Sequence, residues 1–225
     1  MTKSPQDRLA SVPPVPGTSR RAQFSASTRR ALVEVAEDLF TEHGYAATSL
    51  DAIVAGAEVT KGALYHHFSG KQALFEAVFA KVEAAGAHTI QESLRDQIDP
   101  WEKAIAGLRA FLDVVRQPAY NRIVVQDGPS VLGYERFREQ EARSTFAYVL
   151  DIVRAVLAAG DWKVDADLEH TFARIFFGAM SSAGSTVSSA DDGDAQAERV
   201  ELAIGFILSG LRALADQAVP LPEAP

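Results

Sequence analysis

The ten residues Val59–Phe68 constrain this chain more than any other stretch. Thr60 is a residue type that favours helix N-caps, and Leu64 and Phe68 lie four positions apart, so one side of a short helix can face a core. The opposite side carries one basic, one small and two polar aromatic residues: Lys61, Gly62, Tyr65 and His66. This mixture suits phosphates and base edges better than a protein interior. The stretch therefore predicts the recognition helix of a helix-turn-helix.

The residues that follow predict the start of another helix. Ser69 to Gln72 has the spacing of a capping box, which places Lys71 in the first helical turn. A cation is unfavourable there because a helix N-terminus carries partial positive charge. We therefore expect an external anion, such as a DNA phosphate, to share this position.

Two further helices are predicted before the recognition helix. Apolar residues at helical spacing predict a helix over about residues 27–43, with Gly44 as its stop. Thr48 predicts the cap of the next helix, with Asp51 at the capping-box position. This helix, a tight turn and the recognition helix follow one another with no room for anything else. Such brevity is typical of a helix-turn-helix.

On these residues, the segment from about 27 to 82 resembles the DNA-binding domain of the tetracycline-repressor (TetR) family and covers about a quarter of the chain. The matching residues are Ala36, Leu39, Phe40, Gly44, Tyr45, Thr48, Ser49, Ile53, Val59 to Phe68, Lys71 and Leu74. One position departs from the family, which usually has Gly where this chain has Glu58. In a left-handed turn, a residue other than glycine costs roughly 1–2 kcal/mol.

The resemblance implies a double-stranded DNA operator as partner and a set of contacts to it. Phosphate contacts are expected from Thr48, Tyr65, His67 and Lys71, and base-edge contacts from Lys61, Gly62, Ala63 and His66, beside the cap Thr60. The chemistry agrees, since Gly62 allows close backbone approach and Lys61 can donate to guanine. A structural three-helix unit with a polar face is the alternative.

The net charge of −8 does not exclude nucleic acid, because it is unevenly distributed. Residues 1–75 hold 8 Lys+Arg and 7 Asp+Glu, whereas the remainder holds 14 and 23. The acidic balance therefore lies in the part of the chain that is not expected to contact DNA.

Periodicity predicts an all-α fold, because no strand pattern competes with the helical one. We expect a disordered, proline-rich arm over 1–24, whose Arg20 and Arg21 are either solvated or in contact with DNA. The expected domains are a helix-turn-helix domain over 25–72, a helical effector-binding and dimerisation domain over 73–218, and a frayed tail over 219–225. Within the second domain, helices are expected over about 71–94, 101–116, 134–159, 165–189 and 195–218, with a short helical piece before a turn at 127–129.

A helical domain behind a TetR-like head usually holds a cavity for a small molecule, with apolar walls and a few polar groups. Most aromatic residues of the domain are expected in its core. The candidate ligand contacts are Trp101, Phe111, Tyr120, Arg122, Gln126, Asp127, Tyr134, Phe137, Phe176 and Met180.

The last two helices are the best candidates for a homodimer interface. Each carries an apolar stripe wide enough for an internal core, an intersubunit four-helix bundle, or both. Dimerisation is favoured because two heads related by a two-fold axis can bind successive major grooves. The expected interface residues are Phe172, Phe176, Ala179, Ala183, Ile204, Leu208 and Leu211.

Other classes of function find little support in the sequence. No Gly-rich phosphate loop, nucleophile elbow or catalytic triad spacing is present, so no catalytic residues and no cofactor are expected. His88 and Glu92 share a helix face, and His170 is a conceivable third ligand, but two ligands at helical spacing do not hold a metal. With no cysteine, no bilayer-spanning apolar run and no secretion signal, a cytoplasmic protein without membrane association is expected.

The resulting hypothesis is a ligand-responsive transcriptional regulator, a repressor released from a palindromic operator when a small, mainly apolar effector binds. An activator, or a repressor whose ligand promotes DNA binding, is the alternative within the same fold. A helical enzyme acting on a small molecule, or an interaction module that kept the head, is the alternative from another class.

Overall fold

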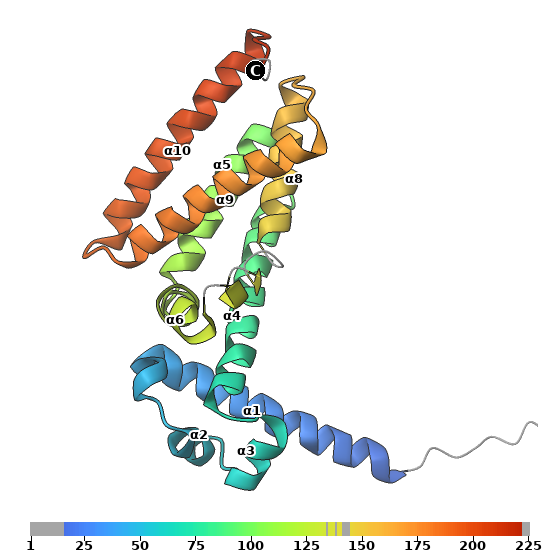
Figure 1. Ribbon diagram of the computed structural model, residues 1–225, viewed down its shortest axis with the longest axis vertical. Helices are drawn as coiled ribbons and strands as arrows, with labels where there is room; N and C mark the ends of the chain where they lie inside the picture. Colours follow the sequence, from blue (N-terminus) through green and yellow to red (C-terminus); the bar gives the residue numbers. More distant parts are fainter. Residues whose placement is uncertain (1–15, 134, 138, 141–144, 222–225) are drawn as a thin grey trace, which may run out of the picture.

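The computed structural model describes residues 16–221, apart from 134, 138 and 141–144. Within these ranges the chain is helical and contains no strand, as the periodicity predicts. Helices α1 to α3 form a head at one end, and α4 (Lys71–Leu94) leads from it into a body built of the remaining helices (Figure 1). None of the described helices is both long and apolar enough to cross a membrane.

The head consists of α1 (Pro16–Ala47), α2 (Leu50–Gly56), α3 (Lys61–His67) and the first turns of α4. Its core is fully closed: Leu32, Phe40 and Ile53 have no exposed surface. The Phe40 ring packs edge-on against Phe75 of α4, with ring centroids 5.3 Å apart. The start of α4 is therefore part of the head core, so the orientation of α4 and that of the head are linked.

The boundaries of α1 correct the predictions in two places. Helix α1 begins at Pro16, so the prediction of a disordered arm is wrong for 16–24, and residues 1–15 lie outside the described residues. Proline is well tolerated in a first helical turn, where its missing N–H is not needed. Gly44 breaks α1 as expected, with φ of 78°, but one more turn follows it.

Both predicted caps on the flanks of the recognition helix are displaced by one residue. Ser49, not Thr48, caps α2 and accepts the amide of Ala52 at 3.1 Å. Gly70 is the N-cap of α4 without a side-chain hydrogen bond, so the predicted capping box of Ser69 and Gln72 does not form. Instead, the Gln72 amide donates to the carbonyl of Val131 at 3.2 Å.

The body comprises α5 (Pro100–Arg116), η1 (Tyr120–Asp127), α6 (Gly128–Leu132), α8 (Phe146–Ala159), α9 (Ala166–Ser188) and α10 (Gly193–Asp216). η1 is a π-helix, and α6 follows it directly, so the predicted turn at 127–129 is absent. The predicted helix over 134–159 is not continuous, because Thr145 is the N-cap of α8, which begins at Phe146.

The end of the chain is held against the body as far as the structure describes it. The Trp162 indole donates to the carbonyl of Val219 at 2.8 Å, and the Val219 amide donates to Leu214. The prediction of a frayed tail is therefore wrong for 219–221, and residues 222–225 lie outside the described residues.

Candidate nucleic-acid interface and internal cavity

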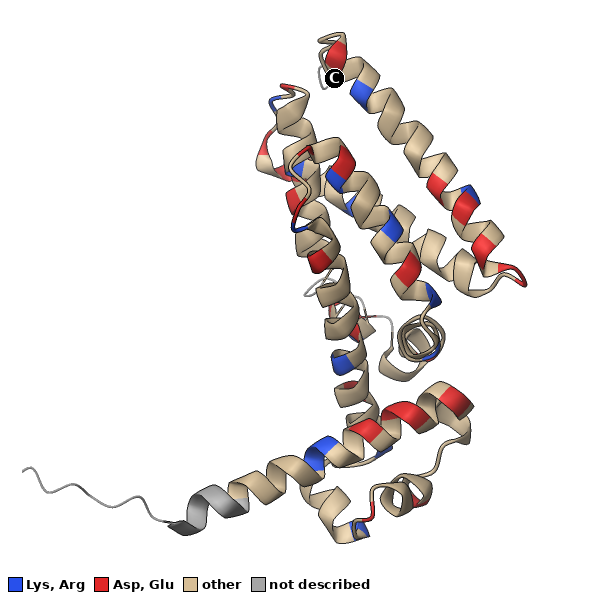
Figure 2. Ribbon diagram, turned by 180° about the vertical axis from the view of Figure 1, so that it is seen from behind, with Lys and Arg blue, Asp and Glu red and all other residues tan. Residues whose placement is uncertain are grey.

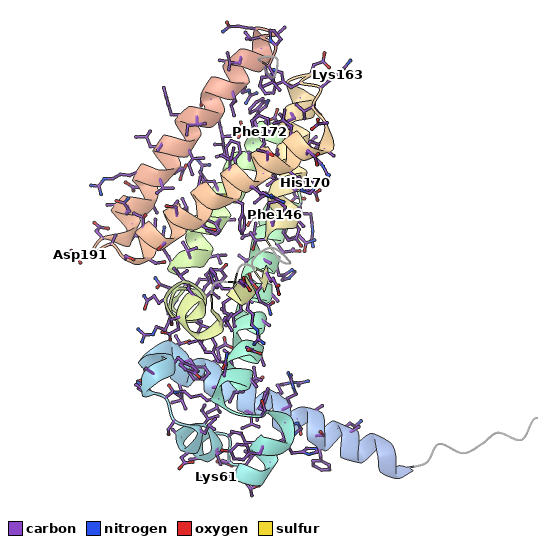
Figure 3. The ribbon with its side chains drawn as sticks, viewed as in Figure 1. Lys61, Phe146, Lys163, His170, Phe172 and Asp191 are labelled. Atoms are coloured by element: carbon purple, nitrogen blue, oxygen red, sulfur yellow. The ribbon has the colours of Figure 1, made fainter. Side chains whose placement is uncertain are left out.

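Helix α3 presents a polar face at the end of the molecule that is farthest from the body (Figures 1 and 3). The Thr60 hydroxyl caps α3 by accepting the Ala63 amide at 3.1 Å, as predicted. Leu64 is buried and anchors the helix to the head core. The opposite face exposes Lys61, Gly62, Tyr65 and His66, whereas Ala63 and His67 are half-buried.

Lys61 is paired on this face with a residue of α2. Its ammonium lies 2.7 Å from a carboxylate oxygen of Asp51, and both side chains remain well exposed. The hydrogen bond to Asp51 and its negative charge raise the pKa of Lys61, which therefore keeps its proton. Sequence reasoning assigned Asp51 to a cap and missed this contact. Lys61 therefore presents a cation at the protein surface. The pair with Asp51 adds little to the stability of the fold, because exposed ion pairs contribute little.

The two histidines at the end of α3 differ in environment. His66 is exposed, whereas His67 packs against Phe68 with ring centroids 6.5 Å apart. Burial, followed by the nearby His66 and Arg29, lowers the pKa of His67. Arg29 stacks over the Phe68 ring at 5.2 Å. His67 is thus placed to pack the helix end in its neutral form.

Thr48 does not fit its predicted role. Only 3% of its surface is exposed, and its hydroxyl lies 2.9 Å from the Gly44 carbonyl oxygen and 3.1 Å from that of Leu39. The side chain therefore joins the end of α1 to the start of α2 and is not available to a phosphate in this structure.

Lys71 lies beside the head–body junction. Its ammonium is 4.3 Å from the centre of the Tyr45 ring and 3.4 Å from the Ala46 carbonyl oxygen. Burial lowers the pKa of Lys71, although the charge of Asp127 opposes this. The Lys71 side chain is half-buried, so a phosphate contact from it stays a prediction.

The turn between α2 and α3 has the left-handed conformation at Glu58, the position where the TetR family that the segment resembles usually has glycine. Glu58 has φ of 53°. Its amide donates to Ala55 and that of Val59 to Val54, each at 3.2 Å. The turn therefore has its usual hydrogen bonds, with a strained residue at its centre.

A second cluster of polar residues joins the head to η1. The Asp127 carboxylate accepts the Tyr45 amide at 2.7 Å and lies 3.4 Å from the Arg122 guanidinium. That guanidinium covers Gly44 so closely that a Cβ there would lie 1.8 Å from one of its nitrogens. Arg122 also donates to the Gln126 amide oxygen at 3.1 Å. Arg122 and Asp127 thus contact the head, and the exposed Gln126 contacts Arg122. These contacts contradict the prediction that the three residues orient a ligand in the body.

The body contains a partly open, almost wholly apolar cavity of about 110 Å³. Its walls come from α4, α5, α8, α9, α10 and the chain end, and include Ile90, Leu108, Val149, Trp162, Phe172, Phe176, Met180, Leu208, Leu211 and Leu221. Of the predicted ligand contacts, Phe176 and Met180 line it. The walls contributed by α8, by Trp162 and by Leu221 were not predicted, because their apolar pattern also fits an ordinary core.

The other predicted ligand contacts lie elsewhere. Trp101 is buried away from the cavity. Phe111 and Tyr120 line a small polar cavity of about 10 Å³ and, with Phe137, an outer cleft of about 290 Å³. Tyr134 lies outside the described residues.

Five residues of the predicted dimer interface line the apolar cavity: Phe172, Phe176, Ile204, Leu208 and Leu211. Leu208 is buried and the other four are half-buried, so their assignment to a subunit interface stays a prediction. Phe172 is labelled on α9 in Figure 3. Ala179 is exposed and Ala183 is half-buried. The large apolar side chains that α9 and α10 expose are Leu168, Ile175, Leu202, Phe206, Ile207 and Leu214.

No group of three or more potential metal ligands occurs among the described residues. His170 stacks on Phe146, with ring centroids 6.3 Å apart (Figure 3). The aromatic contact accounts for the position of this imidazole.

Comparison with known proteins agrees with this geometry. Residues 32–78 match the family described as "Bacterial regulatory proteins, tetR family", and residues 101–211 match "Tetracyclin repressor-like, C-terminal domain". The HTH-type transcriptional regulator SrpR of Pseudomonas putida is 26% identical over 200 residues, which are 86% of this chain and 89% of SrpR.

Solved structures extend the comparison to the whole fold. A TetR-family transcriptional regulator from Pectobacterium atrosepticum is 30% identical with a TM-score of 0.73, and the match covers 85% of this chain and 96% of that one. The structure of RolR in complex with resorcinol has 22% identity and a TM-score of 0.63, with 91% and 100% covered, which is a likeness of fold alone.

Proposed function

Because this chain belongs to the TetR family of transcriptional regulators, we propose that it is a homodimeric repressor that leaves a palindromic operator when a small apolar effector binds in its body. The observation that carries the proposal is the combination of an exposed polar face on α3 with an apolar cavity in the body. The two sites lie at separate places along the molecule and are connected by α4.

The DNA contact is assigned to α3 and its neighbours. Lys61, Tyr65 and His66 are exposed on one face, and Gly62 leaves the backbone open to close approach. Lysine and a phenol suit guanine acceptors and phosphate oxygens respectively. A single head contacts only a few base pairs, so a second copy supplies the other half-site.

Helix α10 supports the proposed dimer. Residues 202–211 contain no charged side chain, which is visible as an uninterrupted tan stretch in Figure 2. Leu208 is turned toward the cavity, whereas Phe206 is 80% exposed and Leu202 is 76% exposed. A helix that is apolar on both sides is normally covered on both sides. We assign the outer side to a second copy, with Ile175 and Ala179 of α9 beside it.

Effector binding reaches the head through η1 and α4. Tyr120, at the start of η1, lines the polar cavity that adjoins the apolar one, and Asp127, at its end, holds the Tyr45 amide. An effector that prefers one placement of η1 therefore also prefers one placement of the head. Release follows as a population shift toward a spacing of the two heads that does not fit successive grooves.

The test is a mobility-shift titration with the DNA upstream of the gene and its neighbours, with unrelated competitor DNA and a series of salt concentrations. Specific, salt-sensitive binding that protects a palindrome is expected. Absence of specific binding by a folded dimer to these segments at low salt would contradict the proposal. Transcription from the bound promoter, with and without the protein, then distinguishes a repressor from an activator.

A further inference from the structure

The pair of Lys61 and Asp51 places a hydrogen-bond donor and an acceptor side by side at the polar face of α3. Asp51 belongs to the first turn of α2, Lys61 is the first residue of α3, and the ammonium lies 2.7 Å from a carboxylate oxygen. The side chain of Lys61 is 65% exposed and that of Asp51 is 69% exposed. Figure 3 labels Lys61 at the end of the molecule that is farthest from the body. The carboxylate therefore belongs to the same surface as the proposed DNA contacts.

A carboxylate on this surface can be matched by only a few groups of DNA. Phosphate oxygens are acceptors and carry negative charge, so they repel the Asp51 carboxylate. In the major groove, the donors are the amino groups at N4 of cytosine and N6 of adenine. An acidic side chain that lies against DNA is therefore matched by a base edge and not by the backbone.

The order of the two side-chain groups favours one base pair. A G·C pair presents the acceptors N7 and O6 of guanine beside the N4 donor of cytosine. O6 and N4 are hydrogen-bonded within the pair and lie about 3 Å apart. The donor and acceptor of Lys61 and Asp51 lie 2.7 Å apart, which is a comparable spacing. The two side chains can therefore meet the two bases of one pair at the same time.

The other base pairs fit this donor and acceptor less well. A C·G pair reverses the order, so that the ammonium would meet an amino group and the carboxylate would meet O6. A T·A pair keeps the order, but it has a methyl group where guanine has N7, and it places the acceptor N7 of adenine beside the carboxylate. G·C is thus the best match and C·G is the worst.

We propose that Lys61 and Asp51 together read one G·C base pair in each half-site, with Lys61 donating to guanine and Asp51 accepting from the amino group of cytosine. The inference rests on the proposed function, in which the polar face of α3 enters the major groove of an operator. It gives Asp51 a role in sequence specificity in addition to its place in the first turn of α2.

The test is a selection from a library of random DNA duplexes by the full-length protein. The enriched site is then titrated by mobility shift with each of the four base pairs at each position. The wild-type protein is expected to prefer G·C over C·G at least about tenfold at one position of each half-site. Asp51→Ala is expected to reduce this preference at least about fivefold at that position, because the acceptor for cytosine is lost.

Asp51→Asn distinguishes base reading from a structural role. A carboxamide pairs with N6 and N7 of adenine, so the preferred base pair is expected to change from G·C to T·A at the same position. A residue that only supported the fold would not change the preferred base. Asp38→Ala, which removes an exposed carboxylate from α1, is the control and is expected to keep the wild-type preference. Circular dichroism confirms the fold of each variant.

The proposed function and this inference fail on different results. If the folded dimer enriches no sequence from the library, the proposed function fails and the inference fails with it. If a palindrome is enriched but no position prefers G·C, or if both Asp51 variants keep the wild-type preference, the role of Asp51 fails alone.

Discussion

The core of the head and helix α10 of the body differ in how completely their apolar side chains are buried. In the head, Phe40 and Ile53 have no exposed surface. In the body, only Ala197 and Leu208 of α10 are buried, and Phe206 on the same helix is 80% exposed. The head core is closed, whereas α10 leaves apolar side chains exposed to solvent and others facing a cavity. This difference supports the proposal that a ligand occupies the cavity and that a second copy covers the outer side of α10.

The largest expected effect is on the free energy of unfolding, when a phenylalanine of the head and one of the body are each replaced by alanine. Phe40→Ala removes a ring packed against Tyr45 and Phe75 at centroid distances of 5.8 and 5.3 Å. A loss of about 3–5 kcal/mol in the free energy of unfolding is expected. The matched change Phe206→Ala is expected to stay within about 0.5 kcal/mol in the monomer. Urea unfolding measures the free energy of unfolding of both variants, at a protein concentration where the chain is monomeric. Equal losses in the two variants would contradict the difference in burial between the head core and α10.

A charge on the outer side of α10 tests what covers it. Phe206→Asp is expected to weaken self-association by at least about 2 kcal/mol, roughly thirtyfold in Kd, because two copies would bury carboxylates without partners. Ile98→Asp is the control, since Ile98 is 96% exposed in the connection between α4 and α5. Sedimentation equilibrium measures both variants. Unaltered association of Phe206→Asp would place the dimer interface elsewhere.

The contact between the two regions is tested at Asp127. Asp127→Ala removes a charged acceptor from the Tyr45 amide, with an expected loss of about 1.5–3 kcal/mol. Hydrogen exchange at this amide is expected to accelerate about tenfold to a hundredfold as a result. Asp127→Asn keeps an acceptor oxygen, so exchange of the Tyr45 amide is expected to be faster than in the wild-type protein and slower than in Asp127→Ala. Glu76→Ala, which removes only the surface pair with Arg136, serves as control. Unchanged exchange in Asp127→Ala would mean that the head is held by apolar packing alone.

The polar face of the head is tested at Lys61. Lys61→Ala is expected to weaken operator binding by about 1–3 kcal/mol if it contacts a base. Tyr65→Ala is expected to weaken it as well, without unfolding the dimer. Lys81→Ala removes a cation of α4 that pairs with Glu37, and it is expected to leave affinity unchanged. The measurement is a mobility-shift titration, and full affinity in both Lys61→Ala and Tyr65→Ala would refute the assigned face.

The smallest expected effect concerns two strained turns, one in each region. Glu58 of the head and Asp161 of the body have φ of 53° and 52°. Substitution by glycine removes the strain of the left-handed conformation, but it also raises the conformational entropy of the unfolded chain. The net effect expected is an increase of about 0.5–1 kcal/mol in the free energy of unfolding. Thermal unfolding of Glu58→Gly and Asp161→Gly measures each gain. A loss of stability at either position would show that its side chain compensates the strain.

The sequence by itself determined the features that depend on residues within about one helical turn of each other. The break at Gly44, the cap at Thr60 and the helix end at Ala159 lie where the pattern predicted them. The polar face of α3 was predictable for the same reason, because all its residues lie on one short helix. The two caps that were misplaced fall in Thr48-Ser49 and Ser69-Gly70, where neighbouring residues are both good caps. Tertiary packing decides that Ser49 and not Thr48 caps α2, because Thr48 is buried against α1.

Only the tertiary structure decided which apolar stripe faces inward and which polar residues meet. Asp127 and Tyr45 are 82 positions apart, and no periodicity predicts that one holds the amide of the other. Both sides of α10 are apolar, so the pattern did not distinguish the cavity wall of Leu208 from the outer face of Phe206. Glu83 likewise becomes buried only when α4 packs against α5 and η1. Burial is a property of several helices together, whereas helical periodicity describes one helix at a time.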